Sequence, residues 1–473
     1  MILHILVGAI LPAVALGRNV LFIMADDLMP LQAGFSEFTP NVNKLARESV
    51  VFRNAHAQYP MCGPSRSSLF TGLAPTTTNI RTNERQPRIC TARTRLASRG
   101  RTLRTLNEVF LEAGYETRGS GKLYHNDEGR GSCCGSELAR ARWTDRADIA
   151  FVGGRHSVAP DLQSVERLAR VPVYQFADVA REDEDRLYID ANITAHAVQE
   201  IEALASPWVY MYGLHKPHLP YFAPKRFRDM LAGGRITPPT TRLRDRRLRD
   251  FRARWREDSQ YKARLPKHDF DEMRLAYFAT VAFADELIGR VLAAAGENTT
   301  VVFLSDHGFH AGEHGFWAKH TLLDGSVRVP LMIRDPRFAP RVSDAPVELL
   351  DVFPTAMDLA GIAPLPRMQD LDGVSLRPIM DGTKTFVKPV ARSWWHIGPR
   401  RFSSVRGTRF RVVSVGSRRR VLDYKPHPRE DRDISRSRTG RRYSWRLRRA
   451  RGGADPPDAH LGAHYVRPYD MKF

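Results

Sequence analysis

A single cysteine begins the segment whose residue types and spacing are best suited to chemistry. Residues 62–66 read CGPSR, and Thr71 and Gly72 follow within one helix length. Pro64 favours the first turn of a helix, and Gly72 favours its end. A helix N-terminus presents free backbone N–H groups and the positive end of a dipole, which suits an anionic substrate. A cysteine alone is often only a small buried apolar side chain, so its neighbours must decide its role.

Acidic, basic and imidazole groups follow four stretches that read as strands, namely the mostly apolar runs at residues 19–24, 208–213 and 300–304 and the more polar residues 115–119. In open α/β sheets, ligands bind outside the carboxyl ends of the strands. The groups found there are Asp26, Asp27, Lys122, His125, His215, Asp306 and His307, and Lys319 follows them. We therefore expect these side chains to meet Cys62 and Arg66 at one edge of a sheet.

Three carboxylates and an imidazole in this set predict one divalent-cation site. Adjacent acids such as Asp26 and Asp27 repel each other, and they tolerate each other best around a cation. Oxygen-rich ligands favour Ca²⁺ or Mg²⁺ over zinc. The cation, with the arginine and the two lysines of the set, would neutralise a sulfate or phosphate and the charge of its transition state. His125 and His215 are suited to proton transfer near neutral pH, although any one of these residues alone could be an ordinary surface or core group.

The elements that must position these groups alternate between strands and helices. Further strands are predicted at residues 50–52 and 329–333, and helices at 39–48, 103–113, 185–204, 270–295 and 347–359. Residues 73–101 are rich in Thr, Arg and Pro and are expected to form a loop. Residues 127–180 are expected to be irregular. The chain is long enough for one large α/β domain and a smaller one.

Three segments are expected along the chain. Residues 1–17 are apolar, end in small residues and have the length of a signal peptide. Residues 18–340 hold the whole candidate site, and residues 341–473 would form a smaller C-terminal α/β subdomain with short strands between 387 and 415. The arginine-rich stretch at 436–451 offers little to bury, so we expect a poorly defined tail. No later stretch is long and apolar enough to cross a bilayer.

The 473-residue chain has a formal net charge of +21, from 73 lysines and arginines against 52 aspartates and glutamates. This excess favours polyanionic partners or reflects solvated segments, such as the arginine-dense residues 242–256. If Cys62 is reserved for chemistry, Cys90 pairs most readily with Cys133 or Cys134. Sequons at Asn192 and Asn298 fit passage through the secretory pathway.

With these motifs the chain resembles the sulfatases of the alkaline-phosphatase-like superfamily, and within them the iduronate-2-sulfatase branch. The likeness covers about residues 18–380. It rests on Asp26-Asp27, CGPSR at 62–66, GKLYH at 121–125, HKPH at 215–218, and SDHG at 305–308 through Lys319. The Asp306-His307 pair and the GEHG at 312–315 are typical of the iduronate branch, since most sulfatases have Asp-Asn there. The region after residue 380 matches the family poorly.

The resemblance implies a large mixed, mostly parallel sheet flanked by helices. It implies a sulfuric ester hydrolase that acts on a glycosaminoglycan or oligosaccharide, first of all on the 2-O-sulfate of iduronate, in the lysosome or outside the cell. It also implies that the formylglycine-generating enzyme oxidises Cys62 to formylglycine in the endoplasmic reticulum. One Ca²⁺ would be held by Asp26, Asp27, Asp306, His307 and the modified Cys62. Arg66 would steady the hydrated aldehyde, with His125 beside it, and the sulfate contacts would be Lys122, His215 and Lys319.

The mechanism implied by this resemblance is covalent. One hydroxyl of the hydrated formylglycine attacks sulfur, and the sugar alcohol leaves with a proton from His215. The second hydroxyl then expels sulfate as the aldehyde reforms, a release that a serine could not achieve. Three alternatives stay open: a sulfatase of other specificity, a phosphate or phosphonate monoester hydrolase on the same fold, and an inactive glycan-binding relative. No nucleic acid is expected as a partner.

Overall fold

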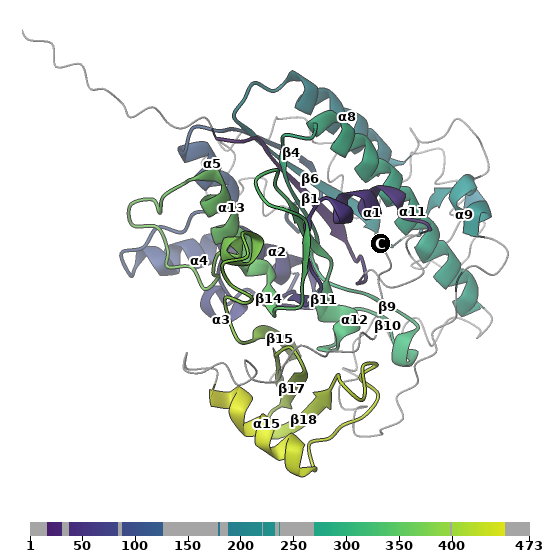
Figure 1. Cartoon of the computed structure of the whole chain (residues 1–473), viewed down its shortest axis with the longest axis vertical. Coiled ribbons are helices and arrows are strands. Elements are labelled where there is room, and N and C mark those ends of the chain that lie inside the picture. Colours follow the sequence, from purple (N-terminus) through teal and green to yellow (C-terminus); the bar gives the residue numbers. More distant parts are fainter. Residues whose placement is uncertain are drawn as a thin grey trace, which may run out of the picture.

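The computed structural model describes residues 17–30, 37–83, 88–125, 178–179, 188–219, 221–231, 236, 269–397 and 400–449. A central sheet has helices on both faces, and a second sheet lies at one end of the molecule (Figure 1). The four predicted strands that precede site residues are β1 (Val20–Asp26), β4 (Glu116–Gly121), β6 (Trp208–Pro217) and β8 (Thr300–Ser305). The expectations for residues 1–16, for most of 127–180 and for 242–256 fall outside the described residues.

The central sheet has seven strands in the order β13-β2-β12-β8-β1-β6-β4. Its other members are β2 (Val50–Phe52), β12 (Leu331–Arg334) and β13 (Arg341–Ser343). Strand β12 runs antiparallel to β2 and β8, whereas the other pairs are parallel. Met24 of β1 lies opposite Leu304 of β8 and Gly213 of β6, so these three strands end at one edge. The predicted large mixed, mostly parallel sheet flanked by helices is confirmed.

Both faces of the sheet are buried, because successive side chains of a strand point to opposite sides. Leu21 and Ile23 belong to one core cluster, and Val20 and Phe22 belong to the other. The first face is covered by α1 (Pro40–Arg47), α8 (Ile189–Ala203) and α11 (Asp269–Ala295). The second is covered by α2 (Cys62–Thr71), α4 (Arg88–Ala97), α5 (Leu106–Glu112) and α13 (Val352–Ala360). The burial of each large apolar side chain contributes about 2 kcal/mol to folding stability. Apolar runs in the sequence therefore indicate strands that are buried on both faces.

Two sequence predictions for the helices that cover the second face of the sheet differ from the structure. Residues 73–101 are not one loop, because they contain α3 (Pro75–Thr78) and α4. Helix α4 buries Ile89, Ala92 and Leu96, whose spacing of three and four residues gives a helix one apolar side. Helix α5 begins three residues later than predicted, since Thr105 and Glu108 form a capping box there.

The predicted helix at 347–359 begins later than expected. Its first residues form β14 (Val347–Glu348) and a 3₁₀ turn (Leu349–Asp351), and α13 follows. Remaining short elements are β3 (Ala55–His56), β5 (Asp178–Val179), β7 (Ala223–Pro224), α9 (Lys225–Leu231), β9 (His310–Ala311), a 3₁₀ turn (Glu313–Gly315), β10 (Trp317–Ala318), α12 (Asp324–Val327), β11 (Arg328–Val329) and α14 (Arg377–Met380). Among the helices of the described residues, none is both long and apolar enough to span a bilayer.

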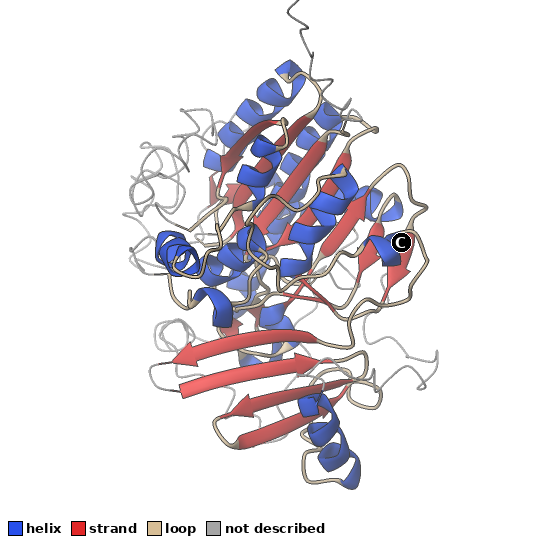
Figure 2. Cartoon of the chain, turned by 90° about the vertical axis from the view of Figure 1, so that its left-hand side faces the viewer, coloured by secondary structure: helices blue, strands red, loops and turns tan. Residues whose placement is uncertain are grey.

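The second sheet has four antiparallel strands, seen at the bottom of Figure 2: β15 (Ala391–Ile397), β16 (Arg400–Arg406), β17 (Phe410–Val415) and β18 (Arg418–Asp423). The arginine-rich tail was expected to pack poorly, but its first part forms α15 (Arg438–Arg449). This helix is anchored by Tyr443, which stacks on Phe410 at 3.7 Å between ring centroids. The domain boundary expected near residue 340 stays a prediction, and β13, which begins at Arg341, still pairs within the central sheet.

Candidate active site

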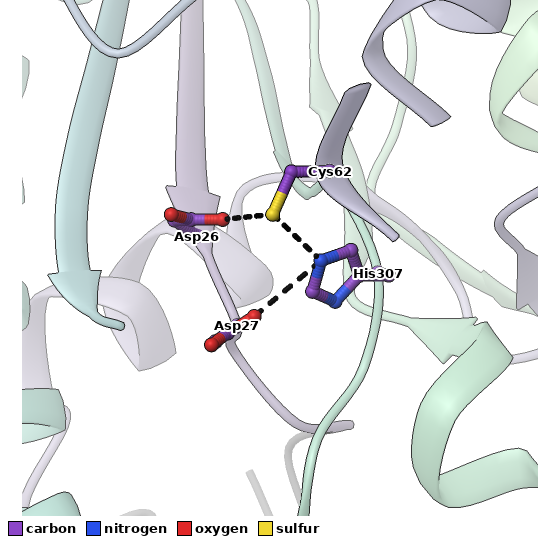
Figure 3. Close-up of side chains that lie close together, drawn as sticks. All are labelled: Asp26, Asp27, Cys62 and His307. Atoms are coloured by element: carbon purple, nitrogen blue, oxygen red, sulfur yellow. Dashed lines mark hydrogen bonds and ion pairs between the residues drawn. The ribbon is translucent and has the colours of Figure 1, made fainter. Parts of the chain in front are cut away.

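Cys62 is the first residue of α2, at the edge where β1, β6 and β8 end (Figure 3). Every residue of α2 is buried, and the helix stops at Gly72. Gly72 has φ +65°, a left-handed conformation that side chains disfavour, and a Cβ there would also lie 2.7 Å from Leu371. The backbone N–H of Gly63, next to Cys62, donates to Oδ1 of Asn83 at 2.8 Å. The predicted helix is therefore confirmed, with Cys62 at its N-terminus.

The sulfur of Cys62 lies among charged groups from three other segments. Its Sγ is 3.4 Å from Asp26 Oδ1, 3.2 Å from His307 Nε2 and 3.3 Å from Lys319 Nζ. Burial raises the pKa of the Cys62 thiol, and the charge of Asp26 raises it further. The unmodified side chain is therefore a neutral thiol, which is a weak nucleophile. Hydrolysis at this position would require a chemically altered side chain.

His307 presents an unprotonated nitrogen to this cluster. Its Nδ1 is 2.9 Å from the carbonyl oxygen of Gly308, which can only accept, so Nδ1 carries the proton. Burial, aided by Lys319, holds the pKa of His307 well below its usual range, so the ring is neutral. Its Nε2 lone pair then faces Asp27 Oδ1 at 3.4 Å. Two electron-pair donors at this separation require a cation or proton between them.

The donors fit a metal ion. One ligand atom from each of Asp26, Asp27, Cys62 and His307 can be chosen so that all four lie within 4.8 Å of one another. Asp27 adopts φ 62°, a left-handed turn that aspartate tolerates, and its Oδ2 accepts no hydrogen bond from the described residues. Burial raises the pKa of Asp27 to about 8, although Lys319 opposes this shift. A bound divalent cation would satisfy these carboxylates, and their oxygens suit Ca²⁺.

Arg66 forms ion pairs with two of the acidic groups. Its Nε donates to Asp306 Oδ2 at 2.8 Å, and its Nη2 is 3.4 Å from Asp26 Oδ1. Its Nη1 donates to the carbonyl oxygens of Lys122 and Leu123. Asp306 thus faces Arg66, while its Oδ2 remains 3.7 Å from His307 Nε2. The predicted role of Asp306 as a further metal ligand stays a prediction.

Two lysines approach Cys62 from different segments. Lys122 Nζ donates to Asp26 and is 4.0 Å from the sulfur of Cys62. Lys319 Nζ donates to Asp27 Oδ1 at 2.7 Å. The residues on either side of Lys319 have positive φ, 65° at Ala318 and 75° at His320. Such conformations are costly for residues other than glycine and gather at functional sites, where they aim a side chain.

His215 is held by a carboxylate that the sequence did not indicate. Asp190, in the first turn of α8, accepts from the backbone N–H of His215 at 3.0 Å and from that of Lys216 at 2.7 Å. It also lies 3.0 Å from Nδ1 of His215. This contact fixes the orientation of the ring through Nδ1. Because Asp190 lies on a distant helix, no local motif could have identified it.

His218 is a second residue that the sequence prediction missed. Its Nε2 lies 3.7 Å from Asp27 Oδ2. A signal was present, because His218 ends the same HKPH run that contains His215. His125 is half-buried, and burial together with Lys122 lowers its pKa to about 3, so it is a neutral base beside the charged cluster. The structure therefore places every predicted site residue at or around one edge of the sheet.

Two arginines lie near His396, a neutral histidine that contacts the segment before Cys62. The hydroxyl of Tyr59, three residues before Cys62, is 3.2 Å from Nδ1 of His396 on β15. Burial lowers the pKa of His396 to about 4, and the charges of Arg81 and Arg401 lower it further. Neither arginine forms an ion pair with a carboxylate of the described residues. These two arginines could therefore accept an additional anionic part of a substrate.

The sequence model of the sulfatase family matches residues 18–362 of this chain. The chain belongs to the sulfatase family. Iduronate 2-sulfatase of Mus musculus is 28% identical over 422 residues, covering 74% of this chain and 70% of the relative. Choline-sulfatase of Rhizobium meliloti is 28% identical over 382 residues, covering 77% of this chain and 72% of the relative. Two relatives that are named after different substrates thus have the same percentage of sequence identity to this chain.

Solved structures give the same fold. The phosphonate monoester hydrolase of Agrobacterium radiobacter has a TM-score of 0.70 and 20% identity, covering 92% of this chain and 96% of the other. A second family model, described as N-sulphoglucosamine sulphohydrolase, C-terminal, matches residues 312–434. The expectation that the region after residue 380 matches the family poorly was therefore wrong. The matched residues include the second sheet and the buried Tyr424 and Glu430.

Proposed function

We propose that this sulfatase removes sulfate from a glycosaminoglycan-type sugar, with the 2-O-sulfate of iduronate as the first candidate. The observation that carries the proposal is the buried cluster of Cys62, two aspartates and His307 with lysines on both sides. A tetrahedral anion placed beside Cys62 would be neutralised by Lys122 and Lys319, and so would the charge of its transition state. Sulfatase chemistry is given by the family, and the sugar is the proposed part.

The state of Cys62 is central to this proposal. As a thiol it is neutral and buried, so we infer that it is oxidised to formylglycine in the secretory pathway. When present, the hydrated aldehyde supplies the oxygen nucleophile and a route for releasing sulfate. Asp26, Asp27, His307 and the modified residue would hold Ca²⁺, with Asp306 as a further candidate ligand. Arg66 would fix Asp26 and Asp306 in place through its contacts at 3.4 and 2.8 Å.

Two histidines at the sheet edge are assigned different roles. Asp190 orients His215 through its Nδ1, and this ring is the proposed donor of a proton to the leaving sugar oxygen. His125 has a pKa of about 3, which makes it a weak base, so we assign it the role of orienting the nucleophile rather than of taking a proton. His215 lies on β6 and His125 follows β4, so the two rings come from different segments.

The preference for a uronic acid is supported by the two arginines near His396. His396 contacts Tyr59 in the segment that leads into Cys62, and the charges of Arg81 and Arg401 act on His396. We infer that the two arginines would hold a carboxylate or a second sulfate on the same sugar. Choline sulfate carries a quaternary cation and would be repelled there. The similarity to iduronate 2-sulfatase agrees with this preference, although relatives that act on other sulfates are about as similar.

Desulfation assays with the purified, secreted chain test the proposal. We expect sulfate release from a disaccharide bearing a 2-O-sulfated uronate, and much slower release from choline sulfate. Parallel assays on an aryl sulfate and an aryl phosphonate address the hydrolase alternative, since the fold is shared with a phosphonate monoester hydrolase. An aldehyde-reactive probe should label the peptide containing Cys62. The absence of both label and sulfate release would reject the proposal.

A further inference from the structure

Helix α15 has one face made mainly of arginine. Its exposed large side chains are Arg438, Arg441, Arg442 and Trp445. Their spacing of three and four residues puts them on one side of the helix. Tyr443 points to the other side, where it is buried against Phe410. The helix is therefore docked through one face and offers a basic face with an exposed tryptophan to solvent.

The arginines of this face lack counter-charges within the described residues. Helix α15 contains no aspartate or glutamate. Arg438 and Arg442 are four residues apart, where like charges repel, and neither forms an ion pair with a described residue. Arg441 donates to the backbone carbonyl of Arg436 rather than to a carboxylate. This repulsion is relieved when an anionic partner lies along the face.

The charge extends beyond the helix. Residues 401–449 contain 17 lysines and arginines against four aspartates and glutamates, so this tenth of the chain holds more than half of its net charge of +21. Three consecutive arginines, at 418–420, begin β18, and α15 packs against β17 and β18. A basic helix face and the edge of a basic strand therefore lie side by side at the outer end of the molecule (Figure 2).

The basic face is separated from the active site by one sheet. Phe410 and Val412 of β17 pack with Tyr443 of α15. Val413, which points the opposite way, packs with Tyr59 and Met61 of the segment before Cys62. The second sheet thus has the catalytic segment on one face and α15 on the other. A ligand on α15 does not compete for the catalytic cluster.

We propose that the exposed face of α15, with the edge of β18, binds the chain of a sulfated polysaccharide outside the active site. Arginine suits this partner, because its guanidinium forms paired hydrogen bonds to sulfate oxygens. Trp445 adds a flat apolar surface on which a sugar ring can rest. Single-stranded nucleic acid usually requires several stacking aromatics, and Trp445 is the sole large aromatic exposed on the described part of this helix. The choice of polyanion rests on the proposed function, but the binding itself does not.

The test compares two charge-reversed forms of the full chain. The first carries Arg438→Glu and Arg442→Glu. The matched control carries Arg47→Glu and Arg99→Glu, two exposed arginines of the large domain. Both are checked for folding by thermal melting, then eluted from a heparin column with salt. They are also assayed on a long sulfated polysaccharide and on a small aryl sulfate.

We expect the α15 variant to elute at clearly lower salt, and its KM for the long polymer to rise about tenfold. Its kcat/KM for the aryl sulfate should match wild type, and the control should behave as wild type throughout. Equal losses in both variants, or unchanged retention of the α15 variant, would overturn the proposal. The proposal would also be overturned if a duplex RNA released the protein from the heparin column as effectively as free heparin does. If wild type shows neither label at Cys62 nor sulfate release, the proposed function fails, while heparin retention still decides the binding surface.

Discussion

Two of the buried clusters of charge among the described residues differ in how completely their polar atoms find partners. One surrounds Cys62, and the other joins the second sheet to α12 through Arg411, Asp324, Tyr424 and Glu430. In the second cluster, Arg411 Nε donates to the Tyr424 hydroxyl at 2.8 Å, and the backbone N–H of Asp324 donates to Glu430 at 2.8 Å. Within the described residues, none of its buried side-chain polar atoms lacks a partner.

The catalytic cluster is incomplete by comparison. Asp27 Oδ2 and Arg66 Nη2 have no hydrogen-bond partner among the described residues, and the His307 lone pair faces another electron-pair donor. The two clusters share one segment, because Lys319 belongs to the first and Asp324 to the second. Complete satisfaction marks a structural joint, whereas buried polar atoms without partners mark a place for a ligand. We therefore expect mutations in the catalytic cluster to affect mainly activity, and mutations in the second cluster to affect mainly stability.

The largest expected effect comes from Cys62→Ser. A serine hydroxyl can accept sulfate but has no second hydroxyl with which to expel it, so turnover should fall by at least about a thousandfold. Mass spectrometry after incubation with substrate should show one sulfate on the peptide that contains residue 62. Cys62→Ala is the control and should show neither turnover nor sulfate. Sustained turnover by the serine variant would contradict the aldehyde route.

Asp27→Asn should lower activity without lowering the stability of the metal-free protein. The change removes a buried carboxylate that lacks enough positive charge, so the metal-free protein should melt at the same temperature as wild type or higher. Activity should fall about a hundredfold or more, because a metal ligand and the partner of Lys319 are lost. Added Ca²⁺ should raise the melting temperature of wild type but not of the variant. A large drop in metal-free stability would contradict the comparison between the clusters.

The sequence predicted this site well because its residues follow buried strands. Apolar runs fix where β1, β6 and β8 lie, and parallel strands bring their ends to one edge, so Asp26, His215 and Asp306 could be placed together. Asp190 could not be placed, because it reaches His215 only after α8 packs against the sheet. The positive φ values at Ala318 and His320 also have no signal in the residue types. They are imposed by tertiary contacts around Lys319.

The second sheet shows a different limit of sequence reasoning. Short strand runs before residue 415 were predicted, but the helix at 438–449 was not, because arginine-rich composition suggested that nothing would be buried. One aromatic contact, Tyr443 on Phe410, was enough to anchor it. In contrast, α4 could have been found, since Ile89, Ala92 and Leu96 have helical spacing and no glycine or proline interrupts them.

Asp324→Asn should affect stability more than activity. Although burial alone would raise it, Arg411 and Arg328 hold the pKa of Asp324 below its usual range. Removal of this carboxylate leaves Arg411 buried with less compensation, which should lower the free energy of unfolding by about 3 kcal/mol. The change in kcat/KM on a small aryl sulfate should stay within about threefold. Arg411→Met added to Asp324→Asn should recover part of the loss, and a purely additive double variant would argue against a coupled cluster.

The smallest expected effect is a pH dependence at Glu430. Burial and then the charge of Asp324 raise its pKa to about 7 from a usual value of 4.5. The folded state thus favours the protonated form, so the stabilising contribution is complete below the unfolded pKa and is lost as the pH rises through 7. Relative to Glu430→Gln, wild type should lose at most about 3 kcal/mol of stability between pH 4.5 and 7.5. Thermal melts across this range measure the difference, with the exposed Glu112→Gln as a control that should show none. If Glu430→Gln and wild type change in parallel with pH, Glu430 is already ionised against Arg411, and the second cluster is a plain salt bridge.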